Sequence, residues 1–220
     1  MTIRLNKIVQ AIPQVETLCD VGCDHGYIGI GAWSQGKAQR VIFMDISAPS
    51  LQKAQNNCAN VQMNNCQFVC QDGIQSVHCD CAVIAGMGGL ETISILQNTT
   101  RPPKFLVLQP MRNQMDVRKY LLSNGYKLTL DVKFQDVKYY DLMVAEQSTE
   151  QMELSPLQLK FGFTNLASPS QDFVNFLLEE QRKYTQILTQ CRDTEVAEKL
   201  SDTSLALEHI GGQQWFKNKC

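Results

Sequence analysis

The chain has 220 residues, of which 44% are hydrophobic and 19% are charged, and its formal net charge is −2 at pH 7. This composition suits one ordinary α/β domain with a modest extension, and it excludes a largely disordered chain. Because the charges nearly balance, a nucleic-acid partner would have to be held by a local basic surface and not by the charge of the whole protein.

The nine cysteines form no Cys-x-x-Cys pair, and no histidine follows them at zinc-finger spacing. We interpret them as buried, reduced thiols and expect no metal site, although Cys79 and Cys81 beside His78 are where one would form. Arg4 and Lys7 interrupt the first apolar residues, and no stretch reaches the roughly 18 apolar residues of a membrane span. We therefore expect a soluble, cytoplasmic protein with no membrane partner.

The N-terminal segment combines an amphipathic helix with a strand and a turn. Apolar side chains recur at near-helical spacing in residues 1–12 and stop at Pro13, which predicts a helix that packs against the domain or beside its ligand cleft. Residues 17–21 form a predicted strand that leads into the turn of residues 20–27, and a helix follows to about Gly36. A strand, a glycine-containing turn and a helix make a nucleotide-sized pocket in α/β proteins.

Two carboxylates in this turn, Asp20 and Asp24, indicate the kind of ligand. They would repel a pyrophosphate, which argues against a dinucleotide, and they suit a ligand with a cationic or hydroxyl-bearing edge. S-adenosylmethionine offers both, in its amino group, its sulfonium and its ribose. We expect Gly22 and Gly26 to shape the pocket around it, because glycine permits sharp turns and close approach. Asp20 or Asp24 would take its amino group.

Asp45 is a further candidate ligand contact, because it ends the next predicted strand, residues 40–44. A nucleotide-binding α/β fold places the carboxylate that takes both ribose hydroxyls about 20 residues past the glycine turn, which is where Asp45 lies. The alternative is an acid that caps the following predicted helix, residues 50–60, or a turn acid before Ser47-Ala48-Pro49. Together with the acidic turn, the position favours the ribose role for Asp45, with Ile46 beside it.

The ends of the third and fourth predicted strands supply further candidate contacts for the cofactor. The third predicted strand, residues 67–70, leads to Asp72 and Gly73, where Asp72 would accept from the exocyclic amine of the cofactor adenine or form a simple Asp-Gly turn. The fourth, residues 81–85, leads to the loop Gly86-Met87-Gly88-Gly89. Such a loop suits a backbone that lies flat against a bulky planar group, and the alternative is a plain flexible turn.

The remaining elements complete an α/β fold. A fifth predicted strand, residues 105–108, leads to Gln109 and Arg112, and two later segments alternate apolar and polar residues as paired strands do. We predict five βα units followed by two extra strands, which make a seven-stranded, mostly parallel sheet with helices on both faces. The further helices are expected at 90–96 and 117–124, and the extra strands at 126–132 and 139–145.

From about residue 148 helix formers dominate, and two apolar stripes, in residues 173–191 and 196–210, predict an antiparallel helical hairpin. We therefore divide the chain into an α/β domain, residues 1–148, and a hairpin, residues 149–220. Cations on the hairpin would make a basic face, although glutamates dilute it and a merely solvated face is the alternative. These cations are Lys160, Arg182, Lys183, Arg192 and Lys199.

In chain order, the sequence contains Arg4-Leu5, Asp20-Val21-Gly22-x-Asp24-His25-x-Tyr27, Asp45 with Pro49 and Ala54, Asp72-Gly73, Ala85-Gly86-Met87-Gly88-Gly89, Leu108-Gln109-Pro110, Arg118-x-x-Leu121 with Asn124-x-Tyr126, and Tyr140. This set resembles the bacterial tRNA (adenine-N1) methyltransferases that modify adenine 22. The resemblance covers most of the chain. The Asp-His-x-Tyr turn and the Gly-Met-Gly-Gly loop together are more specific than any single glycine motif.

The resemblance implies a class I, Rossmann-like methyltransferase fold and S-adenosyl-L-methionine as the cofactor. It implies methylation of N1 of adenine 22 in the D-loop region of tRNA, giving N1-methyladenosine. Residues 1–148 would be the catalytic domain, and the coiled-coil-like hairpin would help to hold tRNA. Three positions depart from the pattern, namely Cys23, Gly26 and Met111, and no base contact is assigned to Met111, where the family usually has Asn.

The expected site has three groups of residues. Asp24, His25, Tyr27 and Gly88 are candidates near the methyl group and the target base, although His25 is equally suited to cap a helix start. The expected cofactor-binding residues are Asp20, Gly22, Asp24, Gly26, Asp45, Ile46, Asp72, Gly73, Gly86 and Met87. The expected substrate-binding residues are Gln109, Arg112, Lys160, Arg182 and Lys183.

Two other kinds of function remain open from the sequence. A methyltransferase for another RNA position or for a small molecule would use the same pocket, with the tail as a lid or a dimer element. An RNA-binding or nicotinamide-binding module would transfer no methyl group, but Asp24 occupies the third glycine position of G-x-G-x-x-G, which counts against a nicotinamide dinucleotide. We expect a monomer.

Overall fold

The computed structural model describes residues 1–217, with side chains for residues 1–212. The chain divides into two compact units. The sheet unit comprises Met1–Leu130 and Tyr140–Met152, and the helical unit comprises Asp131–Tyr139 and the chain from Glu153 onward. Residues 131–139, the tip of a strand pair, therefore belong with the C-terminal helices, which the sequence did not indicate.

The sheet has seven strands in the order β3-β2-β1-β4-β5-β7-β6. Strands β1 to β5 run parallel, and β7 is antiparallel to β5. The strand order reverses between β1 and β4, and in open α/β sheets the carboxyl ends at that point form the ligand crevice. The strands are β1 (Val15–Val21), β2 (Ala38–Asp45), β3 (Cys66–Cys70), β4 (Cys81–Ala85), β5 (Phe105–Gln109), β6 (Tyr126–Gln135) and β7 (Tyr139–Gln147).

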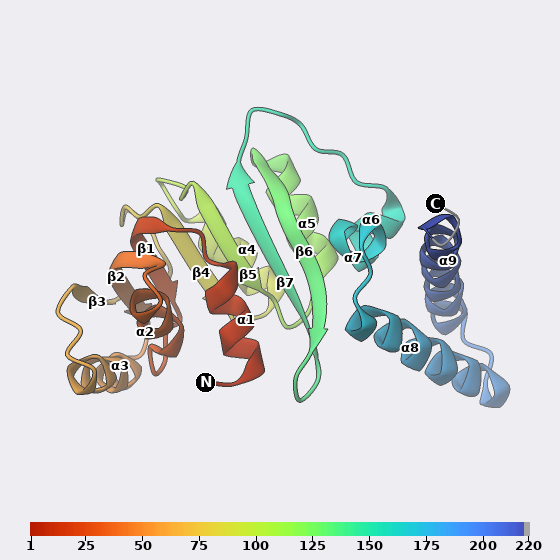
Figure 1. Ribbon diagram of the computed structural model, residues 1–220, viewed down its shortest axis with the longest axis horizontal. Helices are drawn as coiled ribbons and strands as arrows, with labels where there is room; N and C mark the ends of the chain where they lie inside the picture. The colour runs from red at the N-terminus through yellow and green to blue at the C-terminus, as the bar shows by residue number, and fades with distance from the viewer. Residues whose placement is uncertain (218–220) are drawn as a thin grey trace. The chain divides into compact units, whose positions relative to one another are not determined.

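Helices cover both faces of this sheet, as Figure 1 shows, with α1 packed beside α2 on one face and α4 beside α5 on the other. The central strands are nearly continuous apolar runs, as expected for strands buried on both sides. The predicted Rossmann-like fold is confirmed. The helices of this unit are α1 (Ile3–Ala11), α2 (Tyr27–Ser34), α3 (Ala48–Asn60), α4 (Gly89–Gln97) and α5 (Gln114–Ser123).

The prediction of five βα units is wrong at β3, because no helix lies between β3 and β4. The connection, residues 71–80, folds into turns in which the Gln71 side-chain amide donates to the carbonyls of Gly73 and Ile74. Side-chain bonds of this kind compete with helical ones.

The described cysteines are free thiols, and five of them are buried. Cys70 and Cys191 are exposed, which corrects the expectation for those two. Cys220 lies outside the described residues.

The helical unit is built around α8 (Gln171–Gln190) and α9 (Thr194–Lys217), joined by three residues. Leu177 and Phe173 of α8 share one core with Ala206 and Ile210 of α9, so the two helices pack antiparallel, as predicted. Two short helices precede them, α6 (Pro156–Phe161) and α7 (Phe163–Ala167), which the sequence analysis did not separate from the hairpin. No helix in residues 1–217 is long and apolar enough to span a membrane.

Candidate functional site

A cavity of about 250 Å³ lies at the carboxyl ends of β1, β2 and β3, beside α4. It gathers six of the ten expected cofactor-binding residues: Gly22, Asp45, Ile46, Asp72, Gly73 and Met87. Val21, Met44, Gln71, Glu91 and Ile95 complete the lining. Three of these residues carry carboxylates and none of the described lining residues is Lys or Arg, so the cavity favours a neutral or cationic ligand over a phosphate.

Asp45 is fixed at the edge of this cavity by backbone donors. Its Oδ2 accepts the N–H of Asp24 at 3.1 Å, and its Oδ1 accepts the N–H of Ser47 at 2.9 Å. Helix α3 begins one residue after Ser47, whose hydroxyl caps it by accepting from Ser50. The cap of α3 is therefore Ser47 and not Asp45, whereas the bond from the N–H of Ser47 makes Asp45 the acid of a turn, which was the other half of the alternative.

The two acids of the first turn lie in different surroundings. Asp20 is 2% exposed, and its carboxylate accepts the N–H of Gly29 at 2.9 Å in the first turns of α2. Burial raises the pKa of Asp20 from 3.8 to about 7, against the opposing effect of that hydrogen bond. Asp24 is exposed, holds a left-handed backbone at φ 44°, and forms an ion pair with Lys53 at 3.2 Å. Only Asp24 is therefore open to a ligand from solvent.

His25 and Tyr27 form a stacked pair next to Asp24, with ring centroids 5.3 Å apart and planes 4° from parallel. Tyr27 is 49% exposed, although it is the first residue of α2. It also lines a separate hollow of about 530 Å³ together with Met1, Thr2 and Leu5 of the N-terminal segment. An exposed aromatic surface of this kind is suited to stacking against a nucleobase. His25 makes no side-chain bond that caps α2, whose N-cap is Gly26.

The glycine loop after β4 is tied to the segment after β5 by three backbone hydrogen bonds. Gly86 donates to the carbonyl of Gln109 at 3.1 Å, and Met111 donates to that of Met87 at 2.8 Å. Gly89 donates to the carbonyl of Arg112 at 3.0 Å. The loop after β4 and the segment after β5 are therefore held side by side at the carboxyl ends of these two strands. Arg112 is exposed there, whereas the Gln109 side chain is buried.

Glycine is required at position 89 of this loop, where backbone atoms occupy the space that a side chain would take, and it is favoured at position 86, where φ is 84°. A Cβ at Gly86 would lie 2.8 Å from Nη2 of Arg4, and one at Gly89 would lie 2.5 Å from the carbonyl of Arg112. The guanidinium of Arg4 lies against this loop, and the expected contact of the loop with a bulky planar group stays a prediction. At the first turn, a Cβ on Gly22 would lie 2.0 Å from the terminal methyl group of Met87, so the side chain of Met87 lies over that turn.

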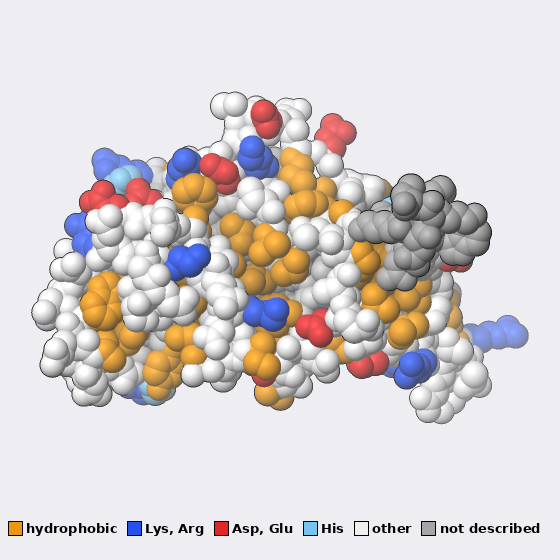
Figure 2. Space-filling view, viewed as in Figure 1, with side chains coloured by type: hydrophobic (Ala, Val, Ile, Leu, Met, Phe, Trp, Pro, Cys, Tyr) orange, Lys and Arg blue, Asp and Glu red, His pale blue; other side chains and the backbone are white. Residues whose placement is uncertain are grey.

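The basic residues expected to bind RNA in the helical unit are partly neutralised. Lys160 pairs with Asp202, and Lys183 pairs with Glu180 at 3.0 Å. Arg182 lines a hollow between α8 and α9 and makes no ion pair within the described residues. On the face that Figure 2 shows, Lys and Arg side chains stand among Asp and Glu, and the described residues form no broad basic surface there.

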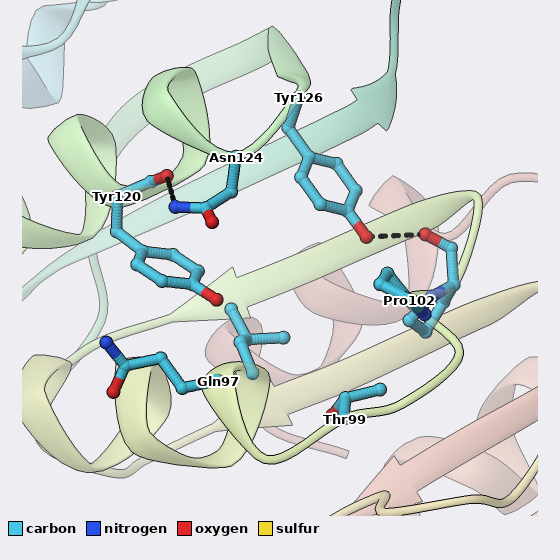
Figure 3. A pocket seen from close by; sticks show the side chains of 8 residues that line it. Gln97, Thr99, Pro102, Tyr120, Asn124 and Tyr126 are labelled. Carbon is cyan, nitrogen blue, oxygen red and sulfur yellow. Dashed lines mark hydrogen bonds between the residues drawn. The ribbon is translucent and has the colours of Figure 1, made fainter.

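A larger cavity of about 360 Å³, drawn in Figure 3, lies elsewhere in the sheet unit. It is lined by the ends of α4 and α5 and the loop before β5, at the opposite ends of the strands from Asp45. Tyr126 closes it by donating to the carbonyl of Pro103 at 2.7 Å, and Asn124 donates to that of Tyr120. It contains no carboxylate and no glycine turn, so the smaller cavity is the better candidate despite its size.

Sequence reasoning missed several residues of the site. The sequence analysis gave no role to Glu91, which lies in the first turn of α4, or to Met44 and Ile95. Arg4 and Tyr140 were part of the motif set, yet no role was given to either. Their proximity to Gly86 and Gln109 depends on the packing of α1 and β7, which no local pattern reveals.

The profile of a family described as "Methyltransferase domain" matches residues 1–143. The chain belongs to this methyltransferase family. The match covers the whole sheet as far as β7, including both glycine-containing turns and the cavity between them.

Relatives of this methyltransferase carry more specific names. A Mycoplasma pneumoniae protein, provisionally named a tRNA methyltransferase, is 30% identical over 71% of this chain and 78% of its own length. The Bacillus subtilis tRNA (adenine(22)-N(1))-methyltransferase is 28% identical over 84% of this chain and 80% of its own. The resemblance that the motifs indicated is confirmed.

A solved structure gives the same fold. A Streptococcus pneumoniae protein, provisionally named a tRNA (m1A22) methyltransferase and crystallised with S-adenosyl-L-methionine, superposes with a TM-score of 0.84 at 24% identity. The likeness covers 94% of this chain and 99% of that one, so it includes the helical unit as well as the sheet unit.

Proposed function

We propose that this methyltransferase uses S-adenosyl-L-methionine to methylate N1 of adenine 22 in tRNA, giving N1-methyladenosine. The observation that carries the proposal is the cavity at the strand-order reversal, with its glycine turn, three carboxylates and no lining cation. That chemistry suits a sulfonium cofactor and opposes the pyrophosphate of a nicotinamide dinucleotide. The names of the relatives supply the substrate and the position on it.

The residues present fit the cofactor. Asp45, already oriented by two backbone N–H groups, would hold the ribose hydroxyls, and Asp72 would accept from the adenine amine. Gly22, Gly26 and Met87 would shape the space for the methionine part, with Ile46, Gly73 and Gly86 around it. Asp24 would take the amino group, while buried Asp20 would support the turn from below through Gly29. The bound cofactor supplies an electrophilic methyl group.

The protein's contribution to methyl transfer is positioning, desolvation and charge stabilisation. Adenine N1 has a free lone pair at neutral pH, so no side chain has to remove a proton from it first. The attack leaves positive charge on the base, which Asp24 would stabilise by accepting from the base's exocyclic amine. His25 and Tyr27 would stack beside the base, and Gly88 would leave room for it. N1 lies on the pairing edge, so the base must be unpaired or flipped out.

The tRNA would be held at two places within the chain. Arg112 is the exposed cation beside the glycine loop, and Lys160, Arg182 and Lys183 lie in the helical unit. We assign catalysis to residues 1–148 and tRNA holding to the chain from 149 onward. The protein would act as a monomer in the cytoplasm, where tRNA is modified.

Incubating bulk tRNA with isotopically labelled S-adenosyl-L-methionine and analysing the nucleosides tests the function. We expect label in N1-methyladenosine, at position 22 when the product is mapped. Another labelled nucleoside, or label only in a small molecule, would overturn the assignment of the substrate.

Titration calorimetry with S-adenosyl-L-methionine and with NAD tests the cofactor. If Asp45 holds the ribose, Asp45→Ala should weaken the binding of S-adenosyl-L-methionine by far more than about twofold, or roughly 0.4 kcal/mol.

A further inference from the structure

Arg4 of α1 is bound to the end of β5. Its Nε donates to Oε1 of Gln109 at 2.6 Å, across 105 residues of sequence. Gln109 is 1% exposed, so this bond fixes a buried amide whose orientation would otherwise be set by weak partners such as the sulfur of Met111, 3.3 Å from its Nε2. A charge-assisted bond to a buried amide is short and directional.

The same guanidinium also contacts the ends of two other strands. Its Nη2 lies 2.8 Å from the place where a Cβ on Gly86, just after β4, would stand. Its central carbon lies 5.4 Å from the ring centroid of Tyr140, at the start of β7. Because β7 is antiparallel to β5, its start lies at the same edge as the carboxyl ends of β4 and β5. Arg4 therefore joins three strand ends with one rigid, planar group.

This edge lies outside the described lining of the cavity proposed for the cofactor. Arg4, Gln109 and Tyr140 are absent from the described lining of the cofactor cavity, whereas Met87, which follows Gly86, is part of it. The backbone of Gln109 in turn accepts from Gly86, so a shift of Gln109 would move the glycine loop with it. Reacting atoms have to be aligned closely, and a displacement of about 1 Å can cost about a hundredfold in rate.

We propose that Arg4 is a positioning residue that sets the glycine loop and Gln109 in place for the target base, without binding the cofactor. Gln109 then acts through this arrangement and not by contacting the base. The inference rests on the proposed methyl transfer for its kinetic test, and it has a second test that does not.

The kinetic test compares Arg4→Ala with the wild-type protein. We expect kcat to fall by about tenfold or more, while the Kd for S-adenosyl-L-methionine stays within about twofold. Arg4→Lys should recover only part of the loss, because an ammonium lacks the planar fork, and added methylguanidine should restore part of the activity of Arg4→Ala. Arg101→Ala, which removes an exposed cation from the loop before β5, is the matched control and should keep wild-type kcat.

A double-mutant cycle decides whether Arg4 and Gln109 act together. Arg4→Ala combined with Gln109→Ala should lose no more than about the larger single loss, since residues that act as a unit are not additive. Losses that multiply, or Arg4→Ala with unchanged kcat, would overturn the inference. An equal weakening of cofactor binding would also overturn it, because it would place Arg4 in the cofactor site.

The second test follows the methyl resonances of Met87 and Met111 by NMR in protein labelled at methionine methyl groups, assigned by Met→Leu variants. Arg4→Ala should shift both resonances, and Arg101→Ala should shift neither. Unshifted resonances in Arg4→Ala would reject the inference whatever the substrate. A wild-type protein that gives no N1-methyladenosine, together with shifted resonances, would reject the proposed function alone.

Discussion

Asp20 and Asp24 lie four positions apart in one turn, yet their surroundings give them different tasks. Asp20 is buried next to α2, and its carboxylate accepts a hydrogen bond from the N–H of Gly29. Asp24 stands in solvent beside His25 and Lys53. A residue type at the right spacing was enough to locate the turn, but burial decides which acid meets a ligand. The buried acid should be visible in the pH dependence of stability.

The pKa of Asp20 is raised in the folded protein, from 3.8 to about 7. Between these two values the folded state binds more protons than the unfolded state, so stability falls as pH rises through this range and levels off above it. Each pKa unit corresponds to about 1.4 kcal/mol. Asp20→Asn, which keeps the acceptor for Gly29, should flatten this slope in urea unfolding measured from pH 5 to 8.

Asp24→Asn is the control for this measurement, because it removes a carboxylate from the exposed part of the same turn and leaves Asp20 in place. If the slope is the same in Asp20→Asn and in the wild-type protein, folding does not raise the pKa of Asp20. The buried carboxylate would then need a cationic partner that the described residues do not provide.

At the scale of elements, the site depends on two loops that fit around each other. The terminal methyl group of Met87, from the loop after β4, fills the space above Gly22, from the loop after β1. Gly22 also has φ 66°, a left-handed value that costs other residues about 1–2 kcal/mol. Two separate causes therefore require glycine at this position, and they can be measured apart.

Gly22→Ala should raise the Kd for S-adenosyl-L-methionine by about tenfold or more, or roughly 1.4 kcal/mol, because the new Cβ displaces Met87 into the cavity. Gly36→Ala is the matched control, since Gly36 has a similar φ of 69° and no atom within 4 Å of the added Cβ. It should lose stability to a similar extent and keep the wild-type Kd. Adding Met87→Ala to Gly22→Ala should bring the Kd back toward that of Met87→Ala alone, because the steric conflict is removed, while the loss of stability from the left-handed backbone should remain. Equal Kd values for the two alanine variants would contradict the steric argument.

The elements that the sequence predicted well are those with a strong local signal. The apolar strands and the glycine turns gave the sheet and six residues of one cavity. The short helices α6 and α7 were missed because one or two turns show little periodicity, and the missing helix after β3 reflects side-chain bonds of Gln71. The contact of Arg4 with Gln109 could not be predicted, because it arises only when α1 packs against the end of β5.

For the whole molecule, charge limits how RNA is held. The net charge is −2, and several cations of the helical unit are paired with acids, among them Lys160, Lys183 and Lys199. An ammonium that already pairs with a carboxylate releases fewer counterions when it meets a phosphate. Arg182 makes no ion pair within the described residues, so in the proposed role of the helical unit its loss should have a measurable effect on its own.

Arg182→Ala should weaken tRNA binding and reduce the slope of log K against log salt by about 1, as expected for one lost phosphate contact. Lys183→Ala, at the neighbouring position, is the comparison and should reduce the slope by less than Arg182→Ala does, because its ammonium already pairs with Glu180 at 3.0 Å. Filter binding of tRNA between about 50 and 200 mM salt measures both. Equal changes for the two variants would mean that the ion pair of Lys183 opens on binding. An unchanged slope for Arg182→Ala would remove this part of α8 from the tRNA-binding surface.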